Sequence, residues 1–203
     1  MSEWQETLRT LEFDRLLDYL EPYALSEPGA AELRASHPYG DPEALRREQA
    51  LVSEMRRVLD FDDPFPIDAF PDIRPHLRKA SIEDNLLSPQ ELVEVSSTAM
   101  LAYNLRKYFR GKLDRYPSLA EVIEPVASFA WLHKEISYAI DLKTFEVLDR
   151  ASPDLSRVRK QIVSTQEHAR RRMESLQRQL ARQGLLQEDL VTLRDGRLVL
   201  MVK

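Results

Sequence analysis

Residues 152–183 read SPDLSRVRKQIVSTQEHARRRMESLQRQLARQ, and this stretch predicts one long α-helix. Ser152 is a typical N-cap, Pro153 suits the first helical turn, and Asp154 complements the positive end of the helix dipole. At 1.5 Å per residue, a helix over Leu155–Gln183 has a length of about 44 Å. Apolar residues recur three or four positions apart along it, at Leu155, Val158, Ile162, Ala169, Met173, Leu176 and Leu180.

The face opposite this apolar stripe is basic. Leu155–Gln183 contains eight Lys or Arg and two Glu, a net charge of +6, whereas the whole chain has −5. Lys and Arg neutralise nucleic-acid phosphates and release counterions, so the face is either a solvated surface of a coiled-coil arm or a DNA-binding face. The candidate phosphate contacts are Arg157, Lys160, Arg171, Arg178 and Arg182 on the helix, with Arg194, Arg197 and Lys203 after it.

Capping signals predict further helices upstream. Asp41-Pro42-Glu43 and Ser88-Pro89-Gln90-Glu91 each place an N-cap residue before a proline at the first helical position. The second of these is also a capping box, and Ser118-Leu119-Ala120-Glu121 predicts another one, in a short helix that stops before Pro125.

Apolar spacing predicts two earlier helical segments, over Leu8–Tyr23 and Pro28–Ala35. Between the predicted helices, residues 61–71 combine four large apolar residues with three prolines. This composition predicts a loop that packs on the core.

Two stretches alternate with a period of two residues. Asp195-Gly196 between Val191–Arg194 and Arg197–Val202 is the strongest short hairpin signal. Residues near Phe145 and Val147 are predicted to pair with Ile136–Ile140. Because a lone hairpin is marginal in water, we expect the chain to be a fragment of a longer protein.

Together these signals predict a mainly α fold. We expect a helical core over residues 1–150, a long protruding helix over 151–186 and a C-terminal β-hairpin over 187–203.

No motif for catalysis is present in the sequence. The chain has no cysteine, which excludes disulfides and thiolate chemistry, and it has neither a phosphate loop nor a dinucleotide-binding turn. Its four histidines lie far apart in sequence, at His37, His76, His133 and His168. We therefore predict no catalytic, cofactor-binding or metal-binding residue in this chain. A divalent ion on Asp60, Asp62 and Asp63 is a weaker alternative to a solvated loop.

Two further features bear on partners and location. Tyr103 and Tyr108 with Lys107 and Arg110 form either an aromatic-basic nucleic-acid patch or ordinary half-buried helix packing. No secretory signal or apolar stretch of about 20 residues is present, so we expect a cytoplasmic protein without a membrane partner.

Six segments, taken in order along the chain, resemble the MutS-two family, the second bacterial branch of MutS proteins. They are Thr10-Leu11-Glu12-Phe13-Asp14, Ser26-Glu27-Pro28-Gly29, Phe70-Pro71-Asp72-Ile73-Arg74, Leu87-Ser88-Pro89-Gln90-Glu91-Leu92, Ala151-Ser152-Pro153-Asp154-Leu155 and Val191-Thr192-Leu193-Arg194-Asp195-Gly196-Arg197.

The resemblance implies a role for each part. Residues up to about Arg150 would form the MutS core, Leu155–Gln183 the first lever helix, and Val191–Lys203 the start of a β-rich DNA clamp. Two departures from the family pattern are the absence of glycine from Asp141–Asp149, before the lever, and Met201 in place of a proline.

The resemblance also implies the activity of the parent protein. MutS-two proteins are homodimeric ATPases that use ATP and Mg, bind branched DNA, suppress homologous recombination and, in some lineages, act on ribosomes. Their ATPase and small MutS-related endonuclease domains lie outside this chain, which would couple the ATPase to the clamp. The alternative is a self-contained helical module that dimerises as a coiled coil.

Overall fold

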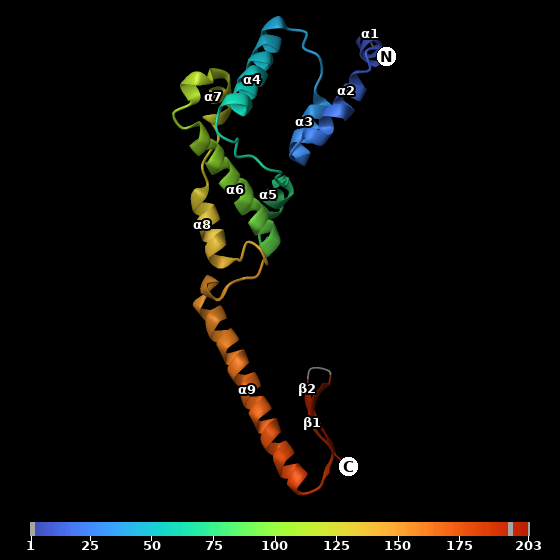
Figure 1. The fold of residues 1–203 in the computed structure, drawn as a ribbon, viewed down its shortest axis with the longest axis vertical. Coiled ribbons are helices and arrows are strands. Elements are labelled where there is room, and N and C mark those ends of the chain that lie inside the picture. The colour runs from blue at the N-terminus through green and yellow to red at the C-terminus, as the bar shows by residue number, and fades with distance from the viewer. Residues whose placement is uncertain (1–2, 195–196, 203) are drawn as a thin grey trace. The chain divides into compact units, whose positions relative to one another are not determined.

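The computed structural model describes residues 3–194 and 197–202, which divide into two compact units, residues 1–147 and 148–203 (Figure 1). The described residues form nine α-helices, three short 3₁₀ helices and one two-stranded sheet, so the predicted mainly α class is confirmed. The first unit contains α1 (Glu3–Thr10), α2 (Phe13–Leu20), η1 (Glu21–Tyr23), α3 (Glu27–Ala35), α4 (Pro42–Phe61), α5 (Arg74–Ala80), α6 (Pro89–Phe109), η2 (Leu113–Arg115), α7 (Pro117–Ile123) and α8 (Ala130–Ala139). The second contains η3 (Asp149–Ala151), α9 (Pro153–Arg182), β1 (Leu186–Arg194) and β2 (Arg197–Val202).

The helical segment predicted over Leu8–Tyr23 is divided in the structure between α1, α2 and η1. Helix α1 ends at Thr10, and Glu12 adopts a left-handed backbone conformation (φ 53°) that no α-helix can continue through. Helix α2 starts immediately after it. The next helix, α3, begins within one residue of its predicted start, where the Ser26 hydroxyl accepts a hydrogen bond from Gly29 N (3.1 Å).

The core of the first unit lies between α4, α6 and α7. Val58, Phe109 and Tyr116 are buried there. The loop after α4 packs against them, because the Phe65 ring lies 6.1 Å from the Phe109 ring and 5.4 Å from the Tyr108 ring, centroid to centroid. The prediction of a loop packed on the core is therefore confirmed.

Three of the four predicted helix caps are present. The Asp41 carboxylate accepts from Glu43 N and Ala44 N, Ser88 and Glu91 form the reciprocal capping box, and Ser152 accepts from Leu155 N. These side chains satisfy backbone donors that the first helical turn leaves without intrahelical partners.

The predicted capping box at Ser118 is wrong. Helix α7 begins at Pro117, so Ser118 lies inside its first turn and cannot serve as its N-cap. The buried carboxylate of Glu54 on α4 instead accepts from Ser118 N (3.2 Å) and Leu119 N (2.9 Å). A side chain 64 residues earlier thus caps α7.

The predicted pairing before the long helix is correct only at its end. Residues 136–139 belong to α8, and Ile140 alone forms an antiparallel bridge with Val147. In the turn between them, the Asp141 carboxylate accepts from Lys143 N (2.8 Å) and Thr144 N (2.9 Å). Phe145 occupies a left-handed position (φ 60°) that glycine adopts at a lower cost.

The second unit confirms both the long helix and the hairpin pairing. Helix α9 ends in a Schellman motif, in which Gly184 (φ 69°) donates to the Ala181 carbonyl and Leu185 donates to the Leu180 carbonyl. Strands β1 and β2 then pair antiparallel, with Arg194 opposite Arg197, and the hairpin contacts α9. The predicted Asp195-Gly196 turn lies outside the described residues.

Candidate nucleic-acid interface

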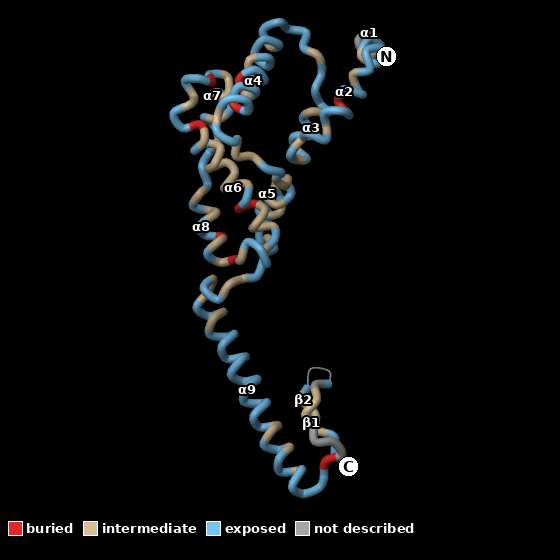
Figure 2. Tube along the Cα trace, in the orientation of Figure 1, coloured by how far each residue is buried: buried red, intermediate tan, exposed pale blue. Residues whose placement is uncertain are grey.

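The basic face of α9 follows the helical repeat. Residues 157, 160, 164, 168, 171, 175, 178 and 182 are spaced three or four apart, and they are Arg, Lys, Ser, His, Arg, Ser, Arg and Arg in that order. All eight side chains are exposed, and residues 157–172 include no residue that is even half-buried (Figure 2). The helix therefore arranges Arg157, Lys160, Arg171, Arg178 and Arg182 in one solvent-facing row.

Acidic neighbours neutralise this row only weakly. Arg157 pairs with Asp154 (2.9 Å) and Arg171 approaches Glu167 at 4.0 Å, with all four side chains at least 66% exposed. Exposed pairs of this kind contribute little free energy, so a phosphate can displace them. Among the described residues, Lys160 and Arg182 form no ion pair, while Arg178 Nε donates to the Glu174 carbonyl (3.2 Å).

Helix α9 also presents hydrogen-bonding side chains beside these cations. Arg157 and Lys160 share an open surface depression with Ser156, Gln161, Ser164 and Thr165. Hydroxyl and amide groups beside cations are common donors to phosphate oxygens. Ser164, four residues after Lys160, continues the basic row, and this spacing is the signal in the sequence that could have revealed it.

The hairpin supplies two more of the predicted cations. Arg194 and Arg197 are register partners at the turn end of β1 and β2, and both are exposed. The remaining predicted contact, Lys203, lies outside the described residues. The described part of the second unit thus has cations on α9 and at one end of the hairpin.

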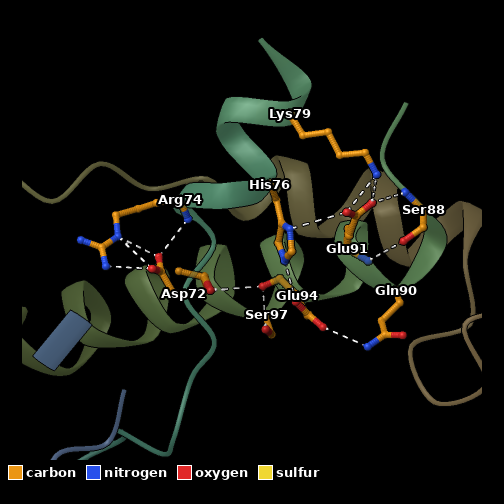
Figure 3. Close-up of polar contacts among 10 residues, drawn as sticks. Asp72, Arg74, His76, Lys79, Ser88, Gln90, Glu91, Glu94 and Ser97 are labelled. Carbon is orange, nitrogen blue, oxygen red and sulfur yellow. Dashed lines mark hydrogen bonds and ion pairs between the residues drawn. The ribbon is translucent and has the colours of Figure 1, made fainter. Parts of the chain in front are cut away.

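A second group of charged residues joins α5 to α6 in the first unit (Figure 3). His76 Nε2 lies 2.6 Å from a Glu94 carboxylate oxygen, and Lys79 Nζ lies 2.7 Å from Glu91. Lys79 and the Ser88 N–H hold the pKa of Glu91 at about 2, well below its usual range. Since protein donors occupy these carboxylates, the group fastens α5 to α6.

Two acidic residues considered as ligands for a divalent ion are also bound by protein cations. Asp62 lies 3.4 Å from Lys112 and from Arg115, and its side chain is 6% exposed, so it does not belong to a solvated loop. Asp63 pairs with the same lysine, at 3.3 Å. Among the residues that the structure describes, no group of three or more His, Asp or Glu is arranged to hold a metal ion.

The fold and the charge pattern define a class of helical proteins in which a long, cation-rich helix follows a helical body. Within the described chain, no helix is both long and apolar enough to cross a membrane. No family model matches the sequence.

Curated relatives match almost the whole chain. The chain is 33% identical over 199 residues to Endonuclease MutS2 of Pelotomaculum thermopropionicum and 33% identical over 201 residues to that of Geobacillus kaustophilus. It is 32% identical over 202 residues to Endonuclease MutS2 of Thermomicrobium roseum. Each match covers 98% of this chain and 25% of the relative, so the chain spans about a quarter of the length of these proteins. Over that segment the chain is homologous to MutS2 proteins.

Proposed function

We propose that this chain is the non-catalytic core and lever region of a MutS2 protein and that α9 binds DNA through its phosphates. The exposed row of cations on α9, with few and weak acidic partners, supports this proposal most directly. The name endonuclease, given to the relatives, is consistent with a nucleic-acid substrate.

The geometry of α9 suits a duplex. From Arg157 to Arg182 the helix rises about 38 Å, which equals about 11 base pairs at 3.4 Å each. Arg194 and Arg197 at the end of the hairpin add two further donors in the same unit. No base-reading arrangement is needed for this grip, so we expect little sequence preference.

The proposal for the whole protein follows from the family. The parts of MutS2 outside this chain would supply an ATPase using ATP and Mg and the endonuclease, and would hold the homodimer together. In that parent, α9 would transmit motion between the ATPase and a DNA clamp during recombination or repair in the cytoplasm. Branched DNA and ribosomes are the partners to test.

Salt dependence of DNA binding is the experiment that tests this grip. With five phosphate contacts, affinity for a labelled duplex should fall about 500-fold between 50 and 200 mM salt, since each contact contributes about 0.9 to the logarithmic slope. The triple variant Lys160→Gln, Arg171→Gln, Arg182→Gln should lower that slope by about 3. Glutamine retains good helix propensity, so α9 should persist.

A matched control is available in the first unit. Arg56 and Arg57 are exposed arginines on α4, and Arg56→Gln with Arg57→Gln should leave the slope unchanged. An affinity that is equal at low and high salt, or a triple variant that binds as tightly as the native chain, would refute the assignment to α9.

The exposed apolar stripe of α9 favours a second candidate, a coiled-coil dimer. Val158, Ile162 and Leu176 are 45%, 51% and 41% exposed, more than core residues tolerate. A dimer by light scattering that disappears on Ile162→Asp plus Leu176→Asp would support this candidate. A monomer that binds DNA would favour the MutS2 lever.

A further inference from the structure

A small basic pocket lies at the C-terminal end of α6, in the first unit, and has no part in the function proposed above. Its lining is Tyr103, Arg106 and Lys107 from α6, Arg110 at the C-cap of that helix, and Ser128 from the connection between α7 and α8. The pocket has a volume of about 300 Å³, at the lower end of the range for small-molecule sites. Three cations and no carboxylate line it.

Arg106 fixes the wall that contains the serine. Its Nη1 donates to the backbone carbonyl of Val126 and approaches that of Glu124 at 3.4 Å. Both carbonyls belong to the segment that leads to Ser128, so this arginine holds the segment beside α6. Arg106 is therefore a positioning residue, and its donors are partly occupied.

Lys107 and Arg110 have their donors available. Within the described chain, neither side chain forms an ion pair or a hydrogen bond, and both are exposed. Lys112 nearby behaves differently, since it pairs with Asp62 and Asp63 and lies 3.9 Å from the centre of the Tyr108 ring. Two free cations, one in the last turn of α6 and one at its C-cap, suit one anionic group.

The structure also separates the two tyrosines of the predicted aromatic-basic patch. The Tyr108 hydroxyl donates to the Asp63 carbonyl (2.7 Å) and its ring packs on Phe65, so Tyr108 belongs to the core. Tyr103 is half-buried and lines the pocket with Lys107 and Arg110. An aromatic ring beside paired cations is the arrangement that binds a base and its phosphate.

A purely structural role for these cations is the competing explanation. Basic residues in the last turn of a helix stabilise its dipole by about 0.3–1 kcal/mol. The same dipole disfavours an anion at this end, but charge-assisted hydrogen bonds from two free cations outweigh an effect of that size. The dipole accounts for neither the tyrosine nor the hydroxyl in the lining.

We propose that this pocket binds one nucleotide unit, with the phosphate on Lys107 and Arg110 and the base against Tyr103. A free nucleotide or a nucleotide within a single strand can supply that chemistry.

Calorimetric titration tests the site in the Lys160→Gln, Arg171→Gln, Arg182→Gln background, which removes the proposed α9 grip. The probes are dAMP, inorganic phosphate and a short oligo-dT strand. Lys107→Gln plus Arg110→Gln should weaken dAMP binding at least tenfold, because both phosphate partners are lost. Arg56→Gln plus Arg57→Gln, the exposed pair on α4, should change it less than twofold.

Variants of the tyrosine test the base contact. Tyr103→Leu should weaken dAMP about tenfold and leave phosphate binding unchanged, whereas Tyr103→Phe should retain dAMP binding. Thermal melts of each variant establish that it folds. If oligo-dT bound more tightly than dAMP, the natural ligand would be a nucleotide within a single strand. If dAMP bound more tightly, it would be a free nucleotide.

Three results would overturn the proposal. If neither dAMP nor oligo-dT bound, the only remaining role of Lys107 and Arg110 would be to stabilise the helix dipole. Binding that persists in the Lys107→Gln, Arg110→Gln variant would place the nucleotide elsewhere. Equal affinities for phosphate and dAMP, insensitive to Tyr103→Leu, would reduce the pocket to a simple anion site.

Discussion

Replacing Glu54 by alanine should destabilise the first unit by about 2 kcal/mol. The Glu54 carboxylate accepts hydrogen bonds from Ser118 N and Leu119 N and is the only side chain in the described structure that caps the start of α7. The substitution removes both acceptors and the negative charge beside the positive end of the helix.

The magnitude follows from two contributions. A partly buried donor left without its acceptor costs about 1–3 kcal/mol, and a charge at a helix N-terminus contributes about 0.3–1 kcal/mol. Water that enters the space left by the side chain bonds to part of the freed N–H groups, and the buried charge no longer needs desolvation. These compensations bring the net cost to about 2 kcal/mol.

Urea unfolding followed by circular dichroism at 222 nm measures the effect. Glu54→Gln keeps one acceptor and should cost about half as much as Glu54→Ala. Glu48→Ala is the matched control, because Glu48 lies exposed on the same helix and should change stability by less than about 0.5 kcal/mol. Equal stabilities for Glu54→Ala and Glu48→Ala would refute the tertiary cap.

Three further changes have defined outcomes. Gly184→Ala should lower the unfolding free energy of the second unit by about 1 kcal/mol in thermal melts, because a side chain at φ 69° is strained although no atom crowds its Cβ. An unchanged melting temperature would argue against the Schellman motif at the end of α9. Glu91→Gln should flatten the acid dependence of the unfolding free energy between pH 4.5 and about 2. A carboxylate with a lowered pKa stabilises the fold above its unfolded pKa, and this contribution is lost as the pH falls through the pKa of the folded state. Unchanged acid unfolding of the variant would contradict the pairing with Lys79. Phe65→Ala should destabilise the first unit by about 2 kcal/mol in urea unfolding, with exposed Phe61→Ala as the near-neutral control.

Local signals predicted the elements whose causes are local. Ser88 and Glu91 are three residues apart, and the side chain of each accepts a hydrogen bond from the backbone N–H of the other, so the capping box was readable from the sequence. The same holds for the long helix, whose apolar and basic residues repeat with the helical period.

The predictions were wrong where a contact with a residue far away in the sequence, or an unusual backbone conformation, decides the structure. Ser118 has the same local pattern as Ser88, but Pro117 occupies the first helical position of α7 and Glu54 supplies the acceptor from another helix. Glu12 and Phe145 adopt left-handed conformations that their residue types disfavour, so no propensity could reveal them.

The candidate site was predictable to a similar extent. The helical period brought Arg157, Lys160 and Arg182 onto one exposed row, as the sequence indicated. The separation of Tyr103 from Tyr108 follows from their five-residue spacing, which turns them about 140° apart on a helix, whereas the contact of Tyr108 with the Asp63 loop could not be predicted.

The exposure of residues 157–172 has a consequence for the hydrogen-exchange behaviour of α9. With its contacts to η3 and the hairpin, α9 has tertiary support, but no buried residue protects this middle stretch. Most helical stability in proteins comes from tertiary packing of an apolar face, so the amides of this stretch should exchange through local helix–coil opening, faster than those of α6. Repulsion among the cations favours the unfolded coil form of this stretch, and a bound polyanion removes that repulsion. DNA that binds this stretch should therefore slow its amide exchange, and part of the binding free energy would be spent on making α9 stiff.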